Sequence, residues 1–193
     1  MTGVQTCALP ICATYEDVLA APANLIAEVI YGVLHTQPRP AMRHANASSH
    51  LGALITNPFR FGIGGPGGWV IYDEPELHLG DEPDILVPDL AGWRRERLAA
   101  LPEDAPWTAI APDWICEVLS PSTQVIDRAQ KMEIYLRERV GHAWLVDPIA
   151  RTLEVYRLGD AIWERLAVFH DDAKARAAPF EAFELPLGLL WER

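Results

Sequence analysis

Short apolar runs bounded by turn residues recur through most of the chain, a pattern typical of β-strands. The segment from Leu25 to His35 predicts two short strands hinged near Gly32. Further strands are expected at residues 69–79, 84–93, 113–120, 142–147 and 152–158, and in the tail around 163–169 and 180–185.

Apolar residues at helical spacing indicate three helices between these strands. A short helix is expected to begin after Thr14, which would cap it. A second helix is expected over 44–54, and a third over 124–139, between two predicted strands. This alternation predicts a single α/β domain built on a mixed sheet flanked by helices.

The composition is that of a globular protein rather than a disordered chain or a membrane protein. Half of the 193 residues are hydrophobic and 22% are charged. Acidic residues outnumber basic ones by 27 to 16, which gives a formal net charge of −11. Such a charge argues against non-specific coating of nucleic acid, and leaves open a local cationic cleft or metal-bridged binding.

The three cysteines, Cys7, Cys12 and Cys116, have no spacing typical of a disulfide framework or a zinc site. We therefore expect a soluble protein of a reducing compartment, the cytoplasm. The first twelve residues lack the basic start of a secretory signal. Residues 3–11, GVQTCALPI, resemble a translated sequencing adapter, so we expect 1–12 to be a non-native scar and 13–193 to form the domain.

Two carboxylates lie in apolar surroundings where charge is costly. Asp89 follows the apolar run 85–87 and precedes Leu90, and Glu117 is the one charged residue in the run 114–119. A buried ion pair with an arginine would explain Glu117 structurally. The functional alternative is a metal ligand or a general base.

Lys131 is the third candidate, on the predicted helix that follows Glu117. A surface ion pair with Asp127, four residues earlier, is the structural explanation. If the helix packs back on the sheet, the Lys131 ammonium would instead point at Glu117. Two carboxylates and a lysine can support phosphodiester hydrolysis, with Mg²⁺ (or Mn²⁺) held by the acids and the lysine stabilising negative charge.

Several segments, in this order, resemble the Uma-type restriction endonuclease family of the PD-(D/E)XK nuclease superfamily: VPDLAGW, APDWICEVLSPST, DRAQKMEIY, VGHAWLVDP and LEVYRL. The resemblance runs from Tyr15 to the C-terminus and implies a single-domain restriction-endonuclease-like core. It also implies a metal-dependent endonuclease that hydrolyses the phosphodiester bonds of DNA, with magnesium or manganese as cofactor.

The family's site residues carry over to three matching positions. Asp89 corresponds to the Asp of the Pro-Asp element, and Glu117 to the acidic residue of the (D/E)XK strand. The usual lysine position two residues further on holds Leu119, and the family's lysine on the following helix matches Lys131. Asp89, Glu117 and Lys131 are thus the predicted catalytic residues, and Asp89 and Glu117 the predicted metal ligands.

Four further residues have weaker assignments. Glu28 matches an early glutamate of the family, and the resemblance implies that it joins the metal site. Tyr31, however, stands where the family has Asp. His44 is a candidate substrate contact, with a helix cap as its structural alternative. Arg94 and Arg95 could contact phosphate, or simply form a solvated face beside Glu96 and Glu103.

The sequence leaves two classes of function open. One is an active Mg²⁺-dependent endonuclease acting on DNA. The other is a catalytically inactive nuclease-fold module for binding or assembly, which the net charge of −11 favours. Cutting both strands of a duplex needs two active sites, so a homodimer is expected.

Overall fold

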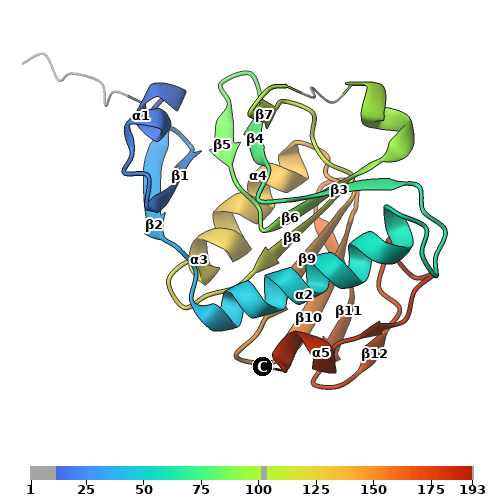
Figure 1. The fold of residues 1–193 in the computed structure, drawn as a ribbon. Coiled ribbons are helices and arrows are strands. Elements are labelled where there is room, and N and C mark those ends of the chain that lie inside the picture. The colour runs from blue at the N-terminus through green and yellow to red at the C-terminus, as the bar shows by residue number, and fades with distance from the viewer. Residues whose placement is uncertain (1–11, 101–103, 193) are drawn as a thin grey trace, which may run out of the picture.

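The computed structural model describes residues 12–100 and 104–192 and shows a mixed α/β fold (Figure 1). Residues 1–11 of the predicted scar lie outside the described residues. The elements before the site strand β8 are α1 (Tyr15–Ala20), β1 (Leu25–Ile30), β2 (Val33–Pro38), α2 (Met42–Phe59), β3 (Trp69–Asp73), β4 (Glu76–Leu79), β5 (Asp84–Leu86), β6 (Leu90–Arg94), the 3₁₀ helix η1 (Arg95–Ala100) and β7 (Trp107–Thr108).

The second half of the chain carries the site strand and the helix that follows it. Its elements are β8 (Trp114–Val118), α3 (Gln124–Ile126), the π turn η2 (Asp127–Lys131), α4 (Met132–Arg137), β9 (His142–Asp147), β10 (Thr152–Leu158), β11 (Trp163–His170), β12 (Lys174–Ala175), β13 (Leu185–Pro186) and α5 (Gly188–Trp191).

The central sheet has six strands in the order β11-β10-β9-β8-β6-β3. The strands β8 and β9 are parallel, and the other neighbours are antiparallel. A parallel pair needs a crossover, and the helical stretch from α3 to α4 supplies it. Helix α2 covers one face of the sheet and α4 the other, so the site strand β8 lies inside the protein (Figure 1).

A separate five-stranded sheet, in the order β2-β1-β5-β4-β7, stands beside the central one. Its β1–β2 hairpin turns through Tyr31 and Gly32, whose φ angles of 51° and 72° match a type I′ turn. The backbone N–H of Tyr31 donates to Asp84 Oδ1 and thereby ties the hairpin to β5. Tyr31, where the resembling family has Asp, therefore serves the turn through its backbone.

Two of the predicted strands are each divided between the sheets. The segment 69–79 breaks at Glu74, which has a φ of 44°, and at Pro75. The segment 84–93 breaks at residues 87–89 around Pro88. Proline lacks the N–H that a central strand needs, so the chain leaves one sheet and enters the other at both places. The second break places Val87 and Asp89 between the sheets.

Most of the remaining elements match the sequence predictions. The predicted helix at 44–54 extends over Met42–Phe59, and the helix at 124–139 runs from α3 to α4. The tail strand expected at 180–185 is wrong, because β13 covers Leu185–Pro186 alone. Phe180 lies instead in a loop and packs its ring against Trp69, Trp114 and Trp144.

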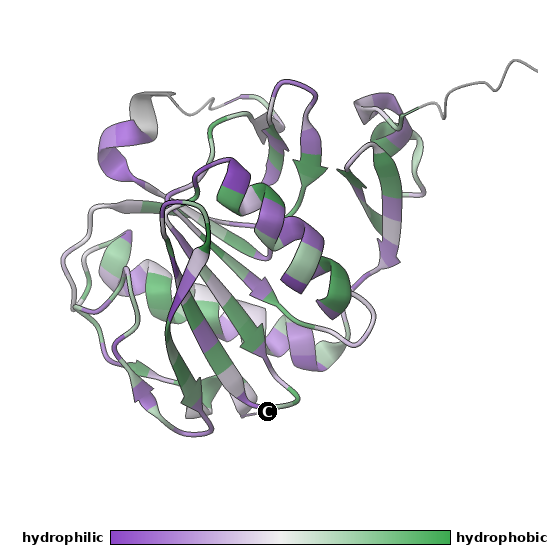
Figure 2. Cartoon of the chain, turned by 180° about the vertical axis from the view of Figure 1, so that it is seen from behind, coloured by the Kyte–Doolittle hydropathy of each residue, from purple (hydrophilic) through white to green (hydrophobic). Residues whose placement is uncertain are grey.

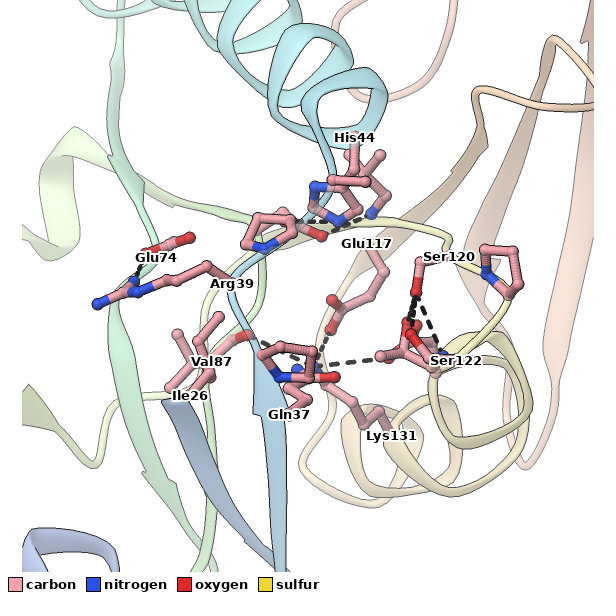
Figure 3. Close-up of a pocket in the computed structure, with 18 residues that line it drawn as sticks. Ile26, Gln37, Arg39, His44, Glu74, Val87, Glu117, Ser120, Ser122 and Lys131 are labelled. Carbon is pink, nitrogen blue, oxygen red and sulfur yellow. Dashed lines mark hydrogen bonds and ion pairs between the residues drawn. The ribbon is translucent and has the colours of Figure 1, made fainter. Parts of the chain in front are cut away.

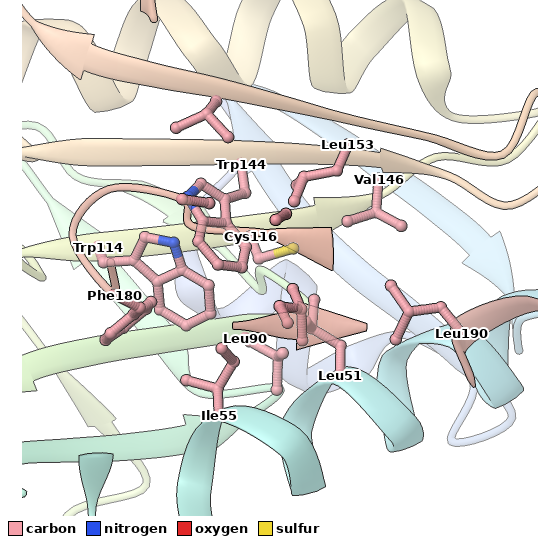
Figure 4. Close-up of a cluster of buried hydrophobic side chains, with 14 of the residues drawn as sticks. Leu51, Ile55, Leu90, Trp114, Cys116, Trp144, Val146, Leu153, Phe180 and Leu190 are labelled. Carbon is pink, nitrogen blue, oxygen red and sulfur yellow. The ribbon is translucent and has the colours of Figure 1, made fainter. Parts of the chain in front are cut away.

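The main hydrophobic core lies between α2 and the central sheet (Figure 4). Leu51 and Ile55 of α2 point at Leu90 and Trp114, and Phe180 closes the cluster at one side. Apolar residues are concentrated along the central strands beneath more polar helices (Figure 2). Within the described residues, no helix has both the length and the apolar character needed to cross a membrane.

Gly92 of β6 lies where two indole rings meet, whereas Gly52 lies in helix α2. Alanine substitutions at these two glycines are therefore expected to change the free energy of unfolding in opposite directions. A Cβ at Gly92 would lie 3.2 Å from Trp114 and 3.3 Å from Trp69. Gly92→Ala is expected to lower the free energy of unfolding by about 1–3 kcal/mol. In α2, a Cβ at Gly52 would lie 3.4 Å from the Leu90 side chain. Gly52→Ala should raise this free energy by roughly 0.5–1 kcal/mol, because alanine favours a helix.

Denaturant unfolding of the two variants and the wild type measures both changes. A Gly92→Ala protein as stable as the wild type would contradict the tight packing described for this core.

Candidate active site

A cavity of about 360 Å³ opens where the β1–β2 hairpin, the β5–β6 connection, β8 and the start of α3 come together (Figure 3). Glu117, Asp89 and Lys131 all line it, each from a different element. Its rim holds Arg39 and the hydroxyl residues of the β8–α3 loop, Ser120, Ser122 and Thr123. The cavity therefore joins the three residues predicted to be catalytic to the protein surface.

Glu117 and Lys131 form a buried ion pair at the base of this cavity. The Lys131 Nζ lies 2.9 Å from Glu117 Oε1, and both residues are almost fully buried. Tyr135, one helical turn further on, donates its hydroxyl to the same Glu117 oxygen at 2.7 Å. The partner of Glu117 is thus a lysine from the following helix, and none of the described arginines forms an ion pair with it.

Glu28 connects this ion pair to the second sheet. Its Oε1 atom lies 2.9 Å from Lys131 Nζ and accepts a hydrogen bond from the Val87 backbone N–H at 2.8 Å. Asp127 Oδ1 lies 3.8 Å from the same ammonium. The predicted Asp127–Lys131 pair exists, but it is buried, because the helix packs with this side against the protein.

Asp89 is held beside the ion pair by the strand that carries Glu117. Its Oδ2 atom accepts a hydrogen bond from the Val118 N–H at 2.7 Å, and its Oδ1 atom lies 3.2 Å from His44 Nε2. Burial lowers the pKa of His44, but the hydrogen bond and charge of Asp89 outweigh it, so this pKa is raised overall. The Nδ1 atom of His44 is buried and has no hydrogen-bond partner among the described residues.

Negative charge exceeds positive charge in this cluster. Burial raises the pKa of Glu117 well above its usual value, and the Lys131 ammonium only partly offsets this effect. Burial also lowers the pKa of the Lys131 amine, but the carboxylates of Glu117 and Glu28 outweigh it and hold this pKa well above its usual value. Lys131 thus stays protonated, and its single positive charge is outnumbered by the carboxylates of the cluster.

A π turn sets the direction of Lys131. The helix widens over Asp127–Lys131, and such turns often occur at functional sites. Arg128 on this turn pairs with Glu154 of β10, and the Tyr156 hydroxyl donates to the same carboxylate at 2.6 Å. These contacts attach the turn to the central sheet while Lys131 faces the cavity.

Arg94 and Arg95 do not line the cavity. They lie at the opposite end of β6 from Asp89, where the Arg94 guanidinium stacks 4.1 Å from the Trp69 ring centroid. The Arg95 side chain donates to the backbone carbonyl of Arg60 at 2.8 Å. Phosphate contact by these two arginines stays a sequence prediction, and the structure gives both groups partners within the protein.

The donor set suits a hard divalent cation such as Mg²⁺. Among the described residues, no three His, Cys, Asp or Glu side chains are arranged to hold a metal ion. Mg²⁺ is usually bound through one or two carboxylates, waters and substrate phosphate, so two carboxylates on one cavity suffice. Asp89 and Glu117 meet this requirement, and the excess of negative charge around them favours a cation.

Some residues of the site were missed by sequence reasoning. Tyr135 is one such residue, because the contact of its hydroxyl with Glu117 leaves no sequence pattern.

The fold and this lysine–carboxylate cavity define a restriction-endonuclease-like α/β protein. A family model described as "Putative restriction endonuclease" (Uma2) matches residues 13–188, and the chain belongs to this family. No curated protein matches the chain. Among solved structures, it is similar to a "putative nuclease belonging to DUF820" from Anabaena variabilis, with 25% identity and a TM-score of 0.73 over 93% of this chain and 97% of that one.

Proposed function

We propose that the protein is a metal-dependent endonuclease that hydrolyses the phosphodiester bonds of DNA. The observation that carries this proposal is the contact of Lys131 with Glu117, beside Asp89, in a cavity open to the surface. Membership of a restriction endonuclease family and the likeness to a nuclease support the same reaction class.

Each side chain has a role that follows from its surroundings. Asp89 and Glu117 would hold the metal, which supplies an activated water and neutralises charge on the phosphate when it is bound. The Lys131 ammonium, kept protonated by two carboxylates, donates hydrogen bonds to the negative charge that develops during the reaction. Glu28 and Tyr135 hold Lys131 and Glu117 in position. His44 is the candidate to contact substrate, because it lines the cavity beside Asp89.

An inactive binding module is the second candidate, and the net charge of −11 favours it. Against it stands the cost of the buried charges. Replacing a buried ion pair by apolar residues is often neutral or stabilising, so a module without turnover gains nothing by keeping this cluster.

We expect the active enzyme to work in the cytoplasm, and as a homodimer if it cuts both strands of a duplex.

Cleavage of supercoiled plasmid with Mg²⁺, Mn²⁺ or a chelator tests the proposal. Wild-type protein is expected to nick or linearise the plasmid when either metal is present, and to lose this activity with the chelator. Asp89→Asn should cleave at least about 10³-fold more slowly, because metal stabilisation is worth several kcal/mol and 1.36 kcal/mol corresponds to tenfold in rate.

Asp73→Asn is the matched control, since Asp73 is a nearby carboxylate on β3 that does not line the catalytic cavity. It should cleave like the wild type. If Asp89→Asn and Asp73→Asn are equally active, a different site or a contaminant is responsible.

A further inference from the structure

A second, larger groove lies next to the catalytic cavity. It has a volume of about 970 Å³ and lies between the first turns of α2, the β9–β10 turn and the end of α5. Helix α5 is held against α2 by Asn46, whose side-chain amide donates to the backbone carbonyl of Leu190 at 3.1 Å. Figure 1 shows α5 beside α2.

The charge of this groove is opposite to that of the protein as a whole. Arg43, His50 and Arg151 line it, and none of its described lining residues is Asp or Glu. By contrast, the catalytic cavity and two further cavities each have three or more acidic lining residues. Arg43 and Arg151 are exposed, and neither guanidinium has an ion pair or hydrogen bond with another described residue. Two free cations in one groove of an acidic protein are complementary to an anionic ligand.

Apolar side chains line the same groove as these cations. Met42 is 85% exposed and Ile149 is 57% exposed. The half-buried Trp191 also lines the groove, and its indole N–H donates to the Asp171 carbonyl at 2.8 Å, which fixes the ring. Grooves that bind single-stranded nucleic acid combine cations for the backbone with apolar or aromatic surfaces on which bases rest. A paired duplex keeps its base faces stacked, so it would leave these apolar side chains unused.

The start of α2 contributes lining residues to both the groove and the catalytic cavity. Ala41 and His44 line the cavity, whereas Met42, Arg43 and Ala45 line the groove. The groove and the catalytic cavity therefore lie at the same end of α2.

We propose that this groove binds an unpaired stretch of the DNA strand next to the cleaved bond, with Arg43 and Arg151 on its phosphates and its bases on Met42, Ile149 and Trp191. The proposal rests on the proposed nuclease function and adds to it the substrate form, a single strand or a single-stranded extension. Such a substrate needs one active site, so binding here does not depend on a dimer.

The double variant Arg43→Gln/Arg151→Gln tests the groove. Binding of a labelled single-stranded 20-mer is measured by fluorescence anisotropy over a range of salt concentrations, with chelator present so that cleavage is suppressed. We expect roughly tenfold weaker binding at low salt, and a log–log salt slope shallower by about 1.4, the value for two phosphate contacts on a single strand. In metal-dependent cleavage, KM should rise while kcat is unchanged.

The control is Arg165→Gln/Arg176→Gln, which removes two exposed arginines elsewhere and changes the net charge equally. It should behave like the wild type. The groove proposal is overturned if both double variants bind and cleave alike. It is also overturned if a blunt duplex binds as tightly as the single strand and loses as much affinity in the groove variant. In either case the nuclease function stands. If wild-type protein cleaves none of these DNAs, the proposed function itself fails.

Discussion

Glu117→Gln is expected to abolish metal-dependent DNA cleavage and to leave a folded protein that is more stable than the wild type at neutral pH. The activity should fall at least about 10³-fold, because a neutral amide is a poor ligand for a hard cation and the lost charge stabilisation amounts to several kcal/mol. Glutamine keeps an oxygen that can accept the hydrogen bonds of Tyr135 and Lys131, and Lys131 keeps its ion pair with Glu28, so neither the core nor the ammonium loses its partners.

The gain in stability follows from the raised pKa of Glu117, whose first cause is burial. A carboxyl group with a raised pKa in the folded state contributes stability fully below its unfolded pKa, about 4.3. That contribution is lost as the pH rises through the folded-state pKa. Metal-free Glu117→Gln should therefore match the wild type near pH 4 and exceed its melting temperature near pH 8.

Thermal unfolding at the two pH values, with chelator present, measures this difference. Glu133→Gln is the control, because Glu133 is an exposed residue of α4 on the same helical stretch as Lys131. It should show neither the loss of activity nor the pH-dependent gain. A Glu117→Gln protein that is less stable than the wild type at pH 8 would show that the Glu117 carboxylate stabilises the folded protein.

Lys131→Met is expected to cause the largest loss of stability. Removal of the Lys131 ammonium leaves Glu117 and Glu28 buried without their shared cation. Removing one partner of a buried ion pair costs about 3–5 kcal/mol. For a chain of this size, one kcal/mol corresponds to about 2–4 °C, so the melting temperature should fall by roughly 6–20 °C. Protonation of the two carboxyl groups relieves part of this cost, so the loss should be smaller at low pH.

Lys174→Met is the matched control, since Lys174 is the other lysine of the chain, is 73% exposed by side chain and contacts Glu184 at the surface. Its melting temperature should stay close to that of the wild type, because exposed ion pairs contribute about 0–1 kcal/mol. Equal effects of the two substitutions would mean that the Lys131 ion pair is not buried in solution.

The sequence predicted the cluster around Glu117 because charge in an apolar strand is costly. That argument identified Glu117 and Asp89, the expected packing of the following helix against the sheet added Lys131, and the family resemblance added Glu28. What it could not predict was how the chain passes between two sheets at Pro75 and Pro88. An apolar run shows that a strand is buried, but it does not show in which sheet the strand pairs, since pairing depends on partners distant in sequence.

The same limit explains the residues that sequence reasoning placed differently or missed. Arg94 follows Asp89 closely in sequence, yet an extended strand carries it to the far end of β6. Arg43 and Arg151 are more than a hundred residues apart, so no local pattern connects them, and packing of α2 near the β9–β10 turn places them in one groove.

We propose that Asp89, Glu117 and Lys131 form one metal-dependent hydrolytic centre. The most direct test is a single plasmid-cleavage experiment in Mg²⁺ with wild type, Glu117→Gln, Lys131→Met and Gly52→Ala, prepared identically and assayed below their melting temperatures. We expect cleavage by wild type and Gly52→Ala, and none above background by the other two. Cleavage by folded Glu117→Gln and Lys131→Met at the wild-type rate would contradict the claim.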